Sequence, residues 1–270
     1  MDWLAGILGL ILDMDGVLWR GDEPLLDIPG FFNEAESMGL KVTLATNNAT
    51  KSVPQYLERF AHFGATLHPD QIVNSPMAAA YYLRARFPNG GPIYIVGESG
   101  LHDTLAGLGF THAEEGVLAV VAGLDRHATY AKLSKASQLV RSGVQFVGTN
   151  PDKTFPAPHG LIPGSGSILA FIEAATDVQP LIMGKPEPFM FNLAITRMGF
   201  NACETLAIGD RLDTDILGGQ KAGCRTAVVL SGVSTQQDVA DWSPTPDLVL
   251  DNLSDLLPRI QHARQEAARP

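Results

Sequence analysis

Residues 7–16, Ile-Leu-Gly-Leu-Ile-Leu-Asp-Met-Asp-Gly, form an apolar run that ends in two carboxylates one residue apart. An apolar run of this length, closed by a turn residue, is typical of a buried parallel strand. Open α/β sheets bind their ligands at the carboxyl ends of the strands, where Asp13 and Asp15 would then lie. Taken alone, the pair is better explained by a turn cap and a solvated side chain, so a functional role requires partners elsewhere in the chain.

The composition describes a globular chain without a basic surface. Its 270 residues are 45% hydrophobic and 18% charged, which is enough to bury the core of one or two domains. The net charge of −10 argues against nucleic acid or an anionic membrane as a partner, because such surfaces need clustered Lys and Arg. The two cysteines show no zinc spacing or disulfide framework, which fits a reducing compartment.

The apolar N-terminus, Trp3 to Leu12, has an acidic residue where a signal peptide carries positive charge, and no small-residue cleavage site follows it. It is also shorter than the ~20 residues that a membrane helix needs. We therefore predict that this segment is a strand of a cytoplasmic protein.

Strand-like apolar runs alternate with segments of helical period along the whole chain. This pattern predicts an α/β fold with a Rossmann-like parallel-sheet core. The core is predicted over 1–78 and 183–270, and an inserted α/β domain over 79–182, with the strongest cluster of chain-breaking residues at 87–92 near its start. The core elements expected with the clearest signals are strands at 41–46, 205–208 and 225–230 and helices at 52–63 and 189–198.

Four polar loops follow strands or adjoin them: Asp13-Met14-Asp15-Gly16, Thr46-Asn47-Asn48, Gly184-Lys185-Pro186 and the acidic loop 209–215. Loops at the carboxyl ends of neighbouring parallel strands converge, so these four are expected to form one site. Each of them alone would be an ordinary turn or helix cap.

Several Asp oxygens without His or Cys form a hard-ligand set suited to Mg²⁺, and the expected contributors are Asp13, Asp15 and Asp210. Carboxylates brought this close repel, so a cation is needed to keep a nucleophile ionised. Asp13 can then attack phosphorus and form an aspartyl phosphate, while Asp15 exchanges protons with the leaving oxygen and with water. Donors for the phosphoryl oxygens are expected from Thr46, Asn47, Asn48 and Lys185.

The motifs Asp-Met-Asp-Gly-Val-Leu, Ala-Thr-Asn-Asn, Gly-Lys-Pro and Gly-Asp-Arg-Leu-Asp-Thr-Asp resemble the four ordered motifs of the haloacid dehalogenase superfamily. The long insertion between the second and third motifs is similar to the large cap domain of p-nitrophenyl phosphatase, phosphoglycolate phosphatase and pyridoxal phosphatase-like enzymes.

The resemblance implies that Asp13 is the nucleophile, Asp15 the acid/base, and Thr46, Asn47 and Lys185 the phosphate contacts. It implies Mg²⁺ held by Asp13, Asp210 and the backbone carbonyl of Asp15. Asp215 is implied as a weaker ligand or a residue just behind the ligands. The expected function is hydrolysis of phosphate monoesters of small metabolites, with a homodimer formed through the cap.

In the inserted domain, Arg126 and His127 are candidate substrate contacts, because they follow an apolar strand in a polar turn. Trp19, Trp242 and His159 are predicted to be structural. Two alternatives stay open: a mutase that moves the phosphoryl group to a second sugar hydroxyl, and a signalling protein that only accepts the phosphoryl group. The order of the motifs disfavours a signalling receiver, since Lys185 precedes the last acidic loop.

Overall fold

The computed structural model describes residues 2–157 and 160–269, so His159 lies outside the described residues. The chain divides into two compact units. Unit 1 comprises Met1–Thr46, Val53–Val73 and Pro186–Pro270, and unit 2 comprises Asn47–Ser52 and Asn74–Lys185. Each unit contains its own parallel sheet, in agreement with the predicted α/β fold.

Unit 1 is built on a six-stranded sheet with the order β15-β14-β13-β1-β4-β5. The pairs from β15 to β4 are all parallel. Strands β2 and β3 form a short antiparallel hairpin that lies between β1 and β4 in the sequence. The strands are β1 (Gly9–Leu12), β2 (Trp19–Arg20), β3 (Glu23–Pro24), β4 (Lys41–Thr46), β5 (Ile72–Asn74), β13 (Thr205–Gly209), β14 (Arg225–Val229) and β15 (Leu248–Leu250).

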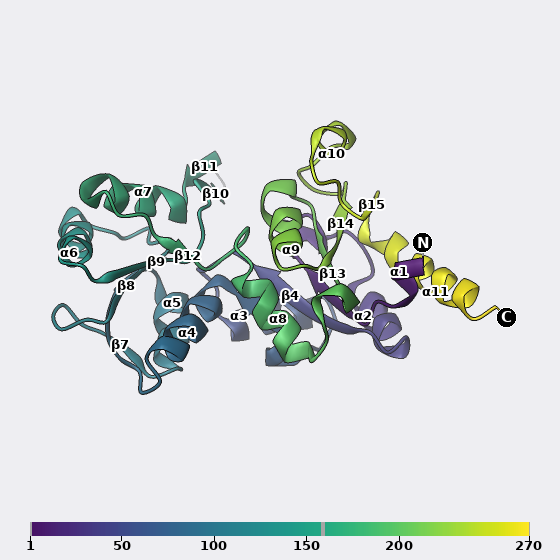
Figure 1. Cartoon of the computed structure of the whole chain (residues 1–270), viewed down its shortest axis with the longest axis horizontal. Helices are drawn as coiled ribbons and strands as arrows, with labels where there is room; N and C mark the ends of the chain where they lie inside the picture. The colour runs from purple at the N-terminus through teal and green to yellow at the C-terminus, as the bar shows by residue number, and fades with distance from the viewer. Residues whose placement is uncertain (1, 158–159, 270) are drawn as a thin grey trace. The chain divides into compact units, whose positions relative to one another are not determined.

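Helices cover both faces of this sheet because alternate strand residues face opposite ways. Leu10 and Leu12 of β1 belong to one buried cluster with residues of α1, α2, α3 and α11, whereas α8 contacts β1 and β4 outside that cluster. The terminal helices α1 and α11 lie side by side (Figure 1). The helices are α1 (Asp2–Ala5), α2 (Ile28–Ser37), α3 (Val53–His62), α8 (Phe189–Met198), α9 (Leu217–Lys221), α10 (Gln236–Asp241) and α11 (Leu256–Ala267).

The N-terminal segment corrects one expectation. The strand begins at Gly9, and residues Asp2–Ala5 form a short helix instead of the start of a strand. Leu4 and Ile7 are as completely buried as the strand residues. An apolar run that is buried throughout does not distinguish helix from strand. The predicted strand was therefore longer than the observed one.

Unit 2 is built on a five-stranded sheet with the order β12-β9-β8-β6-β7, in which every neighbouring pair is parallel. Helices α6 and α7 pack together on one face, and α4 and α5 lie on the other (Figure 1). A separate antiparallel pair is formed by β10 and β11. The elements are α4 (Ser75–Arg86), β6 (Gly91–Val96), α5 (Ser99–Ala106), β7 (Phe110–His112), β8 (Ala119–Ala122), α6 (Tyr130–Arg141), β9 (Gln145–Gly148), β10 (Thr154–Ala157), β11 (Gly160–Pro163), α7 (Ser165–Thr176) and β12 (Leu181–Ile182).

Unit 2 begins before α4 and also takes the segment Asn47–Ser52, whereas the sequence predicted an insertion over 79–182. The chain-breaking cluster 87–92 lies inside unit 2, where its Pro and Gly residues join α4 to β6. The boundary lies before that cluster, as predicted, but at Asn74 instead of residue 79.

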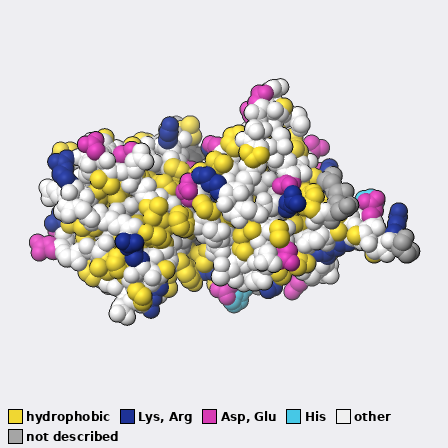
Figure 2. Space-filling view, viewed as in Figure 1, with side chains coloured by type: hydrophobic (Ala, Val, Ile, Leu, Met, Phe, Trp, Pro, Cys, Tyr) yellow, Lys and Arg dark blue, Asp and Glu magenta, His cyan; other side chains and the backbone are white. Residues whose placement is uncertain are grey.

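The surface carries no large basic patch on the face drawn in Figure 2, where the Lys and Arg side chains of the described residues are scattered. Among the helices of residues 2–157 and 160–269, none is both long and apolar enough to cross a membrane.

Candidate active site

The strand order of unit 1 places β1 between β13 and β4. Leu12, the last residue of β1, is in register with Ile208 of β13 and with Leu44 of β4. The backbone N–H of Asp13 continues the ladder by donating to the Ile208 carbonyl at 2.9 Å. Asp13 therefore lies beside the ends of both neighbouring strands. Thr46 is the last residue of β4, and Asp210 directly follows β13.

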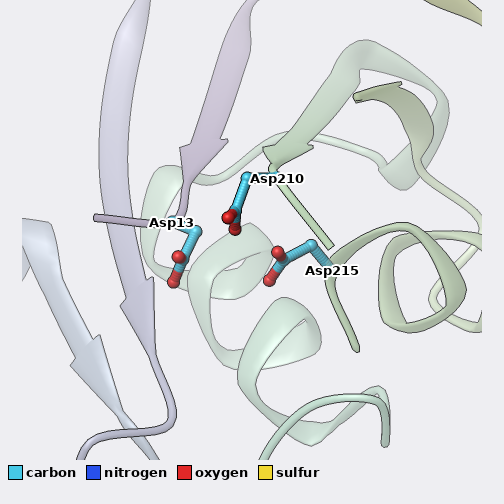
Figure 3. A group of neighbouring side chains, drawn as sticks. All are labelled: Asp13, Asp210 and Asp215. Carbon is cyan, nitrogen blue, oxygen red and sulfur yellow. The ribbon is translucent and has the colours of Figure 1, made fainter. Parts of the chain in front are cut away.

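Three carboxylates gather at this edge of the sheet, from Asp13, Asp210 and Asp215. One oxygen of each lies within 4.8 Å of the others. In Figure 3 they point toward a common space, Asp13 from the end of β1 and Asp210 from the end of β13. Asp210 and Asp215 are both 3% exposed, and carboxylates are seldom this buried unless they are paired or hydrogen-bonded.

This donor set fits Mg²⁺. The ion prefers oxygen ligands at 2.0–2.1 Å in an octahedron, whose oxygens lie about 3 to 4 Å apart. The three carboxylates of Asp13, Asp210 and Asp215 each offer one oxygen, and these oxygens lie within 4.8 Å of one another. The residue types alone suggested that the carboxylate of Asp15 would belong to this cluster. In the structure, the third carboxylate comes from Asp215 instead.

Two glycines make room for Asp210. A Cβ at Gly232 would lie 2.0 Å from Asp210 Oδ2, and one at Gly16 would lie 2.4 Å from the same atom. Gly16 also has a φ of +81°, which side chains rarely adopt. Asp210 Oδ2 accepts a hydrogen bond from the Val233 N–H at 2.8 Å, and Asp215 Oδ2 accepts one from the Arg211 N–H at 3.1 Å. The backbone thus fixes both buried carboxylates.

Substitution Gly232→Ala should therefore weaken metal binding more than it weakens the fold. The new methyl group would displace the Asp210 carboxylate, and changes to groups that orient a ligand typically cost about 10–100-fold in metal affinity. The measurement is the Mg²⁺ concentration that gives half-maximal activity.

The control is Gly6→Ala, because a Cβ at Gly6 meets its neighbour at an ordinary 3.5 Å and lies outside the acidic cluster. An unchanged Mg²⁺ requirement in a folded Gly232→Ala protein would contradict the role given to this close approach.

Asp15 lies outside the acidic cluster, on the exposed side of the loop after β1. Its Oδ1 accepts a hydrogen bond from the indole Nε1 of Trp19 at 2.9 Å. The same loop is tied to the segment after β14, because the Ser231 hydroxyl donates to the Gly16 carbonyl at 2.7 Å.

Thr46 ends β4 and is buried, and its hydroxyl is hydrogen-bonded to that of Tyr56 from α3. Burial raises the pKa of Tyr56 well above its ordinary value, and the charges of Asp15 and Asp13 raise it further. The Tyr56 hydroxyl therefore keeps its proton throughout the working range of an enzyme. It can orient Thr46 but cannot act as a base.

Asn47 and Lys185, both in unit 2, are held together by their polar groups. Asn47 Oδ1 accepts from the Lys185 N–H at 2.7 Å, and Asn47 Nδ2 donates to the Lys185 carbonyl at 2.9 Å. A Cβ at Gly184 would lie 2.5 Å from Asn47 Oδ1, so glycine is required there. The Asn47 amide thus joins two predicted phosphate-binding loops, a role that the sequence did not predict. Asn48 Oδ1 accepts from the Thr50 N–H at 2.9 Å and closes the turn.

Arg126 and His127 are both exposed in unit 2. The Arg126 guanidinium forms two hydrogen bonds of 2.7 Å with the Glu98 carboxylate. These bonds lower the pKa of Glu98 and raise that of Arg126. The His127 N–H donates to Asp125 Oδ1 at 3.0 Å. The ion pair gives Arg126 a structural role in this unit, and substrate contact by either residue stays a prediction.

Sequence reasoning missed Tyr56 and Gly232, and it did not predict which residues Trp19 and Gly184 would contact, although Trp19 was expected to be structural and Gly184 belonged to a predicted motif. Aromatic residues and glycines of this kind occur throughout any α/β chain. Gly184, for example, lies against Asn47 from a distant part of the chain, and such a contact leaves no signal in the local pattern.

Two family models match the chain, one described as haloacid dehalogenase-like hydrolase over residues 10–111 and one as HAD-hydrolase-like over residues 182–256. The 5'-nucleotidase YutF of Bacillus subtilis is 31% identical over 252 residues, covering 93% of this chain and 98% of the relative. The acid sugar phosphatase of Staphylococcus aureus is 33% identical, covering 93% and 97%.

The structure of 4-nitrophenylphosphatase from Thermotoga maritima superposes with a TM-score of 0.90 at 31% identity, covering 96% of this chain and 99% of that one. These relatives match both units over nearly their full length. With the four motifs and the acidic cluster, they show that the chain belongs to the haloacid dehalogenase-like hydrolases, among the phosphatases with a large cap domain.

Proposed function

We propose that the protein is a Mg²⁺-dependent phosphatase that hydrolyses phosphate monoesters of small metabolites through an aspartyl phosphate on Asp13. The observation that carries the proposal is the acidic cluster, in which half-buried Asp13 lies beside buried Asp210 and Asp215 at the carboxyl edge of the sheet. The relatives named as phosphatases support the same reaction class.

In the first half of the reaction, a carboxylate oxygen of Asp13 attacks phosphorus and the bond between phosphorus and the ester oxygen breaks. Asp15 gives its proton to the departing oxygen, so that an alcohol leaves instead of an alkoxide. The covalent step replaces one difficult displacement by two easier ones.

In the second half, Asp15 takes a proton from water as the water oxygen attacks phosphorus. The bond between Asp13 and phosphorus breaks, inorganic phosphate leaves, and both carboxyl groups return to their starting states. Thr46, Lys185 and the Asn47 and Asn48 loop are proposed to bind the phosphoryl oxygens, with Lys185 supplying positive charge. A bound Mg²⁺, held by Asp13, Asp210 and Asp215, would offset the repulsion between phosphate and the carboxylates.

The purified protein should release p-nitrophenolate from p-nitrophenyl phosphate when Mg²⁺ is present. Removing divalent cations with EDTA should abolish this activity, because three neighbouring carboxylates then repel the phosphate. Excess Mg²⁺ should restore it, and excess Ca²⁺ should not, since Ca²⁺ takes more ligands at longer distances. Full activity in EDTA after exhaustive dialysis would contradict the proposed metal dependence.

The substrate class rests on the names of the relatives, which act on sugar phosphates, nucleotides and nitrophenyl phosphate. All three are monoesters of small molecules. A hydrolysis screen over phosphorylated metabolites, ranked by kcat/KM, would identify the preferred leaving group. The cytoplasmic location and the homodimer through the cap remain predictions from the sequence.

A further inference from the structure

Trp19 is fully buried, yet its one polar atom is directed at an exposed carboxylate that the proposed mechanism uses. The indole Nε1 donates to Asp15 Oδ1 at 2.9 Å. We propose that Trp19 is a positioning residue, which holds the Asp15 carboxylate in the orientation needed for proton transfer. This inference rests on the proposed function, since it assumes that Asp15 is the acid/base.

The backbone places the ring against the carboxylate. The Leu18 N–H donates to the Met14 carbonyl at 2.8 Å, and the Gly16 N–H donates to the Trp19 carbonyl at 2.8 Å. These bonds close a tight turn in which Asp15 and Trp19 form a β-bridge. Asp15 and Trp19 therefore belong to one closed loop, and their relative position does not depend on distant parts of the chain.

Side chains from α3 and from the residue that follows it then immobilise the indole. Its ring centroid lies 5.5 Å from that of Phe63, nearly parallel at 21°, and 5.0 Å from that of Phe60. The Arg59 guanidinium lies 4.3 Å from the ring centroid, which is within the range of a cation–π contact. Arg59 in turn donates to the Gly21 carbonyl. The indole is thus enclosed by two side chains of α3, Arg59 and Phe60, and by Phe63 just after its end.

The chemistry of indole suits this role. An indole N–H is a donor and never an acceptor, so Trp19 cannot compete for the proton that Asp15 transfers. The hydrogen bond engages Oδ1 and orients the second oxygen toward the reaction. An exposed carboxylate would otherwise sample several rotamers, each of which places its oxygens differently. A carboxylate 1 Å out of place loses much of the benefit of general acid catalysis.

If Trp19 is purely structural, its substitution should lower the activity equally for all leaving groups. If it positions Asp15, the loss of activity should be larger for leaving groups that need a proton. An alkoxide needs protonation as it leaves, whereas p-nitrophenolate is stable without it. The test is Trp19→Phe, which keeps an aromatic ring but removes the N–H donor. It is assayed with glucose 6-phosphate and with p-nitrophenyl phosphate, and kcat/KM is compared because it reports steps up to loss of the leaving group.

We expect Trp19→Phe to lower kcat/KM for glucose 6-phosphate about tenfold more than for p-nitrophenyl phosphate, a part of the 10²–10⁴ that general acid–base catalysis contributes. Phe31→Leu is the matched control, because it removes a ring of the same buried cluster whose aromatic contact is with Phe32 and leaves the rings around Trp19 in place. It should change both substrates equally. In an Asp15→Asn background, Trp19→Phe should add no further loss.

Equal losses for both substrates in a folded Trp19→Phe protein would overturn the role of Trp19 and leave the phosphatase proposal intact. A wild-type protein that hydrolyses neither ester would overturn the proposed function itself. If Trp19→Phe does not fold, the wild-type and Asp15→Asn proteins can be compared through their indole ¹H–¹⁵N resonances. Of Trp3, Trp19 and Trp242, Trp19 alone should show a large shift, and an unmoved Trp19 signal would refute the hydrogen bond.

Discussion

Asp13→Asn is expected to abolish phosphate release. An amide oxygen is a far weaker nucleophile than a carboxylate, and the substitution also removes one charge from the group of Asp13, Asp210 and Asp215 that would hold the metal. No phosphoenzyme should form. The measurement combines steady-state release of p-nitrophenolate with mass spectrometry of protein quenched in acid, in which wild-type protein gains the mass of one phosphoryl group and the variant does not.

The charge-matched control for this experiment is Asp213→Asn, which also removes one acid from the active-site region. Asp213 is exposed, pairs with Arg211 at 3.0 Å and does not belong to the acidic cluster. It should retain nearly all activity. Undiminished activity of Asp13→Asn would refute the covalent mechanism. A long-lived phosphorylated Asp13 without turnover would favour the phospho-accepting alternative, and an isomerised sugar phosphate in place of free phosphate would favour the mutase.

Asp15→Asn is expected to slow turnover by about 10²–10⁴-fold, the usual contribution of a general acid–base group. The two half-reactions should respond differently to p-nitrophenyl phosphate. Its leaving group departs with little help, so Asp13 is still phosphorylated, whereas attack by water then lacks its base. Rapid-quench measurements should show a burst of about one p-nitrophenolate per enzyme followed by slow release.

Glu23→Gln provides the control for Asp15→Asn, because Glu23 is an exposed acid on the hairpin that follows the same loop. It should show neither the slow phase nor the burst. An Asp15→Asn protein with wild-type rates for aryl and alkyl esters alike would remove Asp15 from the mechanism. The two substitutions are thus predicted to have different effects. Asp13→Asn should prevent the covalent intermediate from forming, whereas Asp15→Asn should trap it.

Periodic segments of the chain were predicted well. The strand at 41–46 and the helix at 189–198 agree with β4 and α8 to the residue. Both are regular in hydrophobic pattern and bounded by local stop signals, such as the left-handed Gly199 that ends α8. The first strand was overestimated because Leu4 and Ile7 are buried in a helix and a turn, where burial leaves no alternation to detect.

The conformation of the acidic loop 209–215 could not be predicted from local sequence patterns. Directly after this loop begins, the chain winds into a π-helical turn at Leu212–Ile216, which leads into α9. That turn carries Asp215 toward Asp13 and Asp210. Widened turns of this kind are frequent at functional sites, and they have no simple residue signature.

What the sequence by itself determined is the chemistry available at each strand end: a pair of acids after the first strand, Thr-Asn-Asn after the second, and an acidic loop after a later one. Those residues follow from local order along the chain. Tertiary structure alone decided which of them meet, because Asp13 reaches Asp210 only when β1 lies between β13 and β4. It also decided that Asn47 holds Lys185, 138 positions away in the chain. Local propensities act over a few residues, whereas these contacts depend on how whole strands and helices pack, and packing is a property of the complete chain.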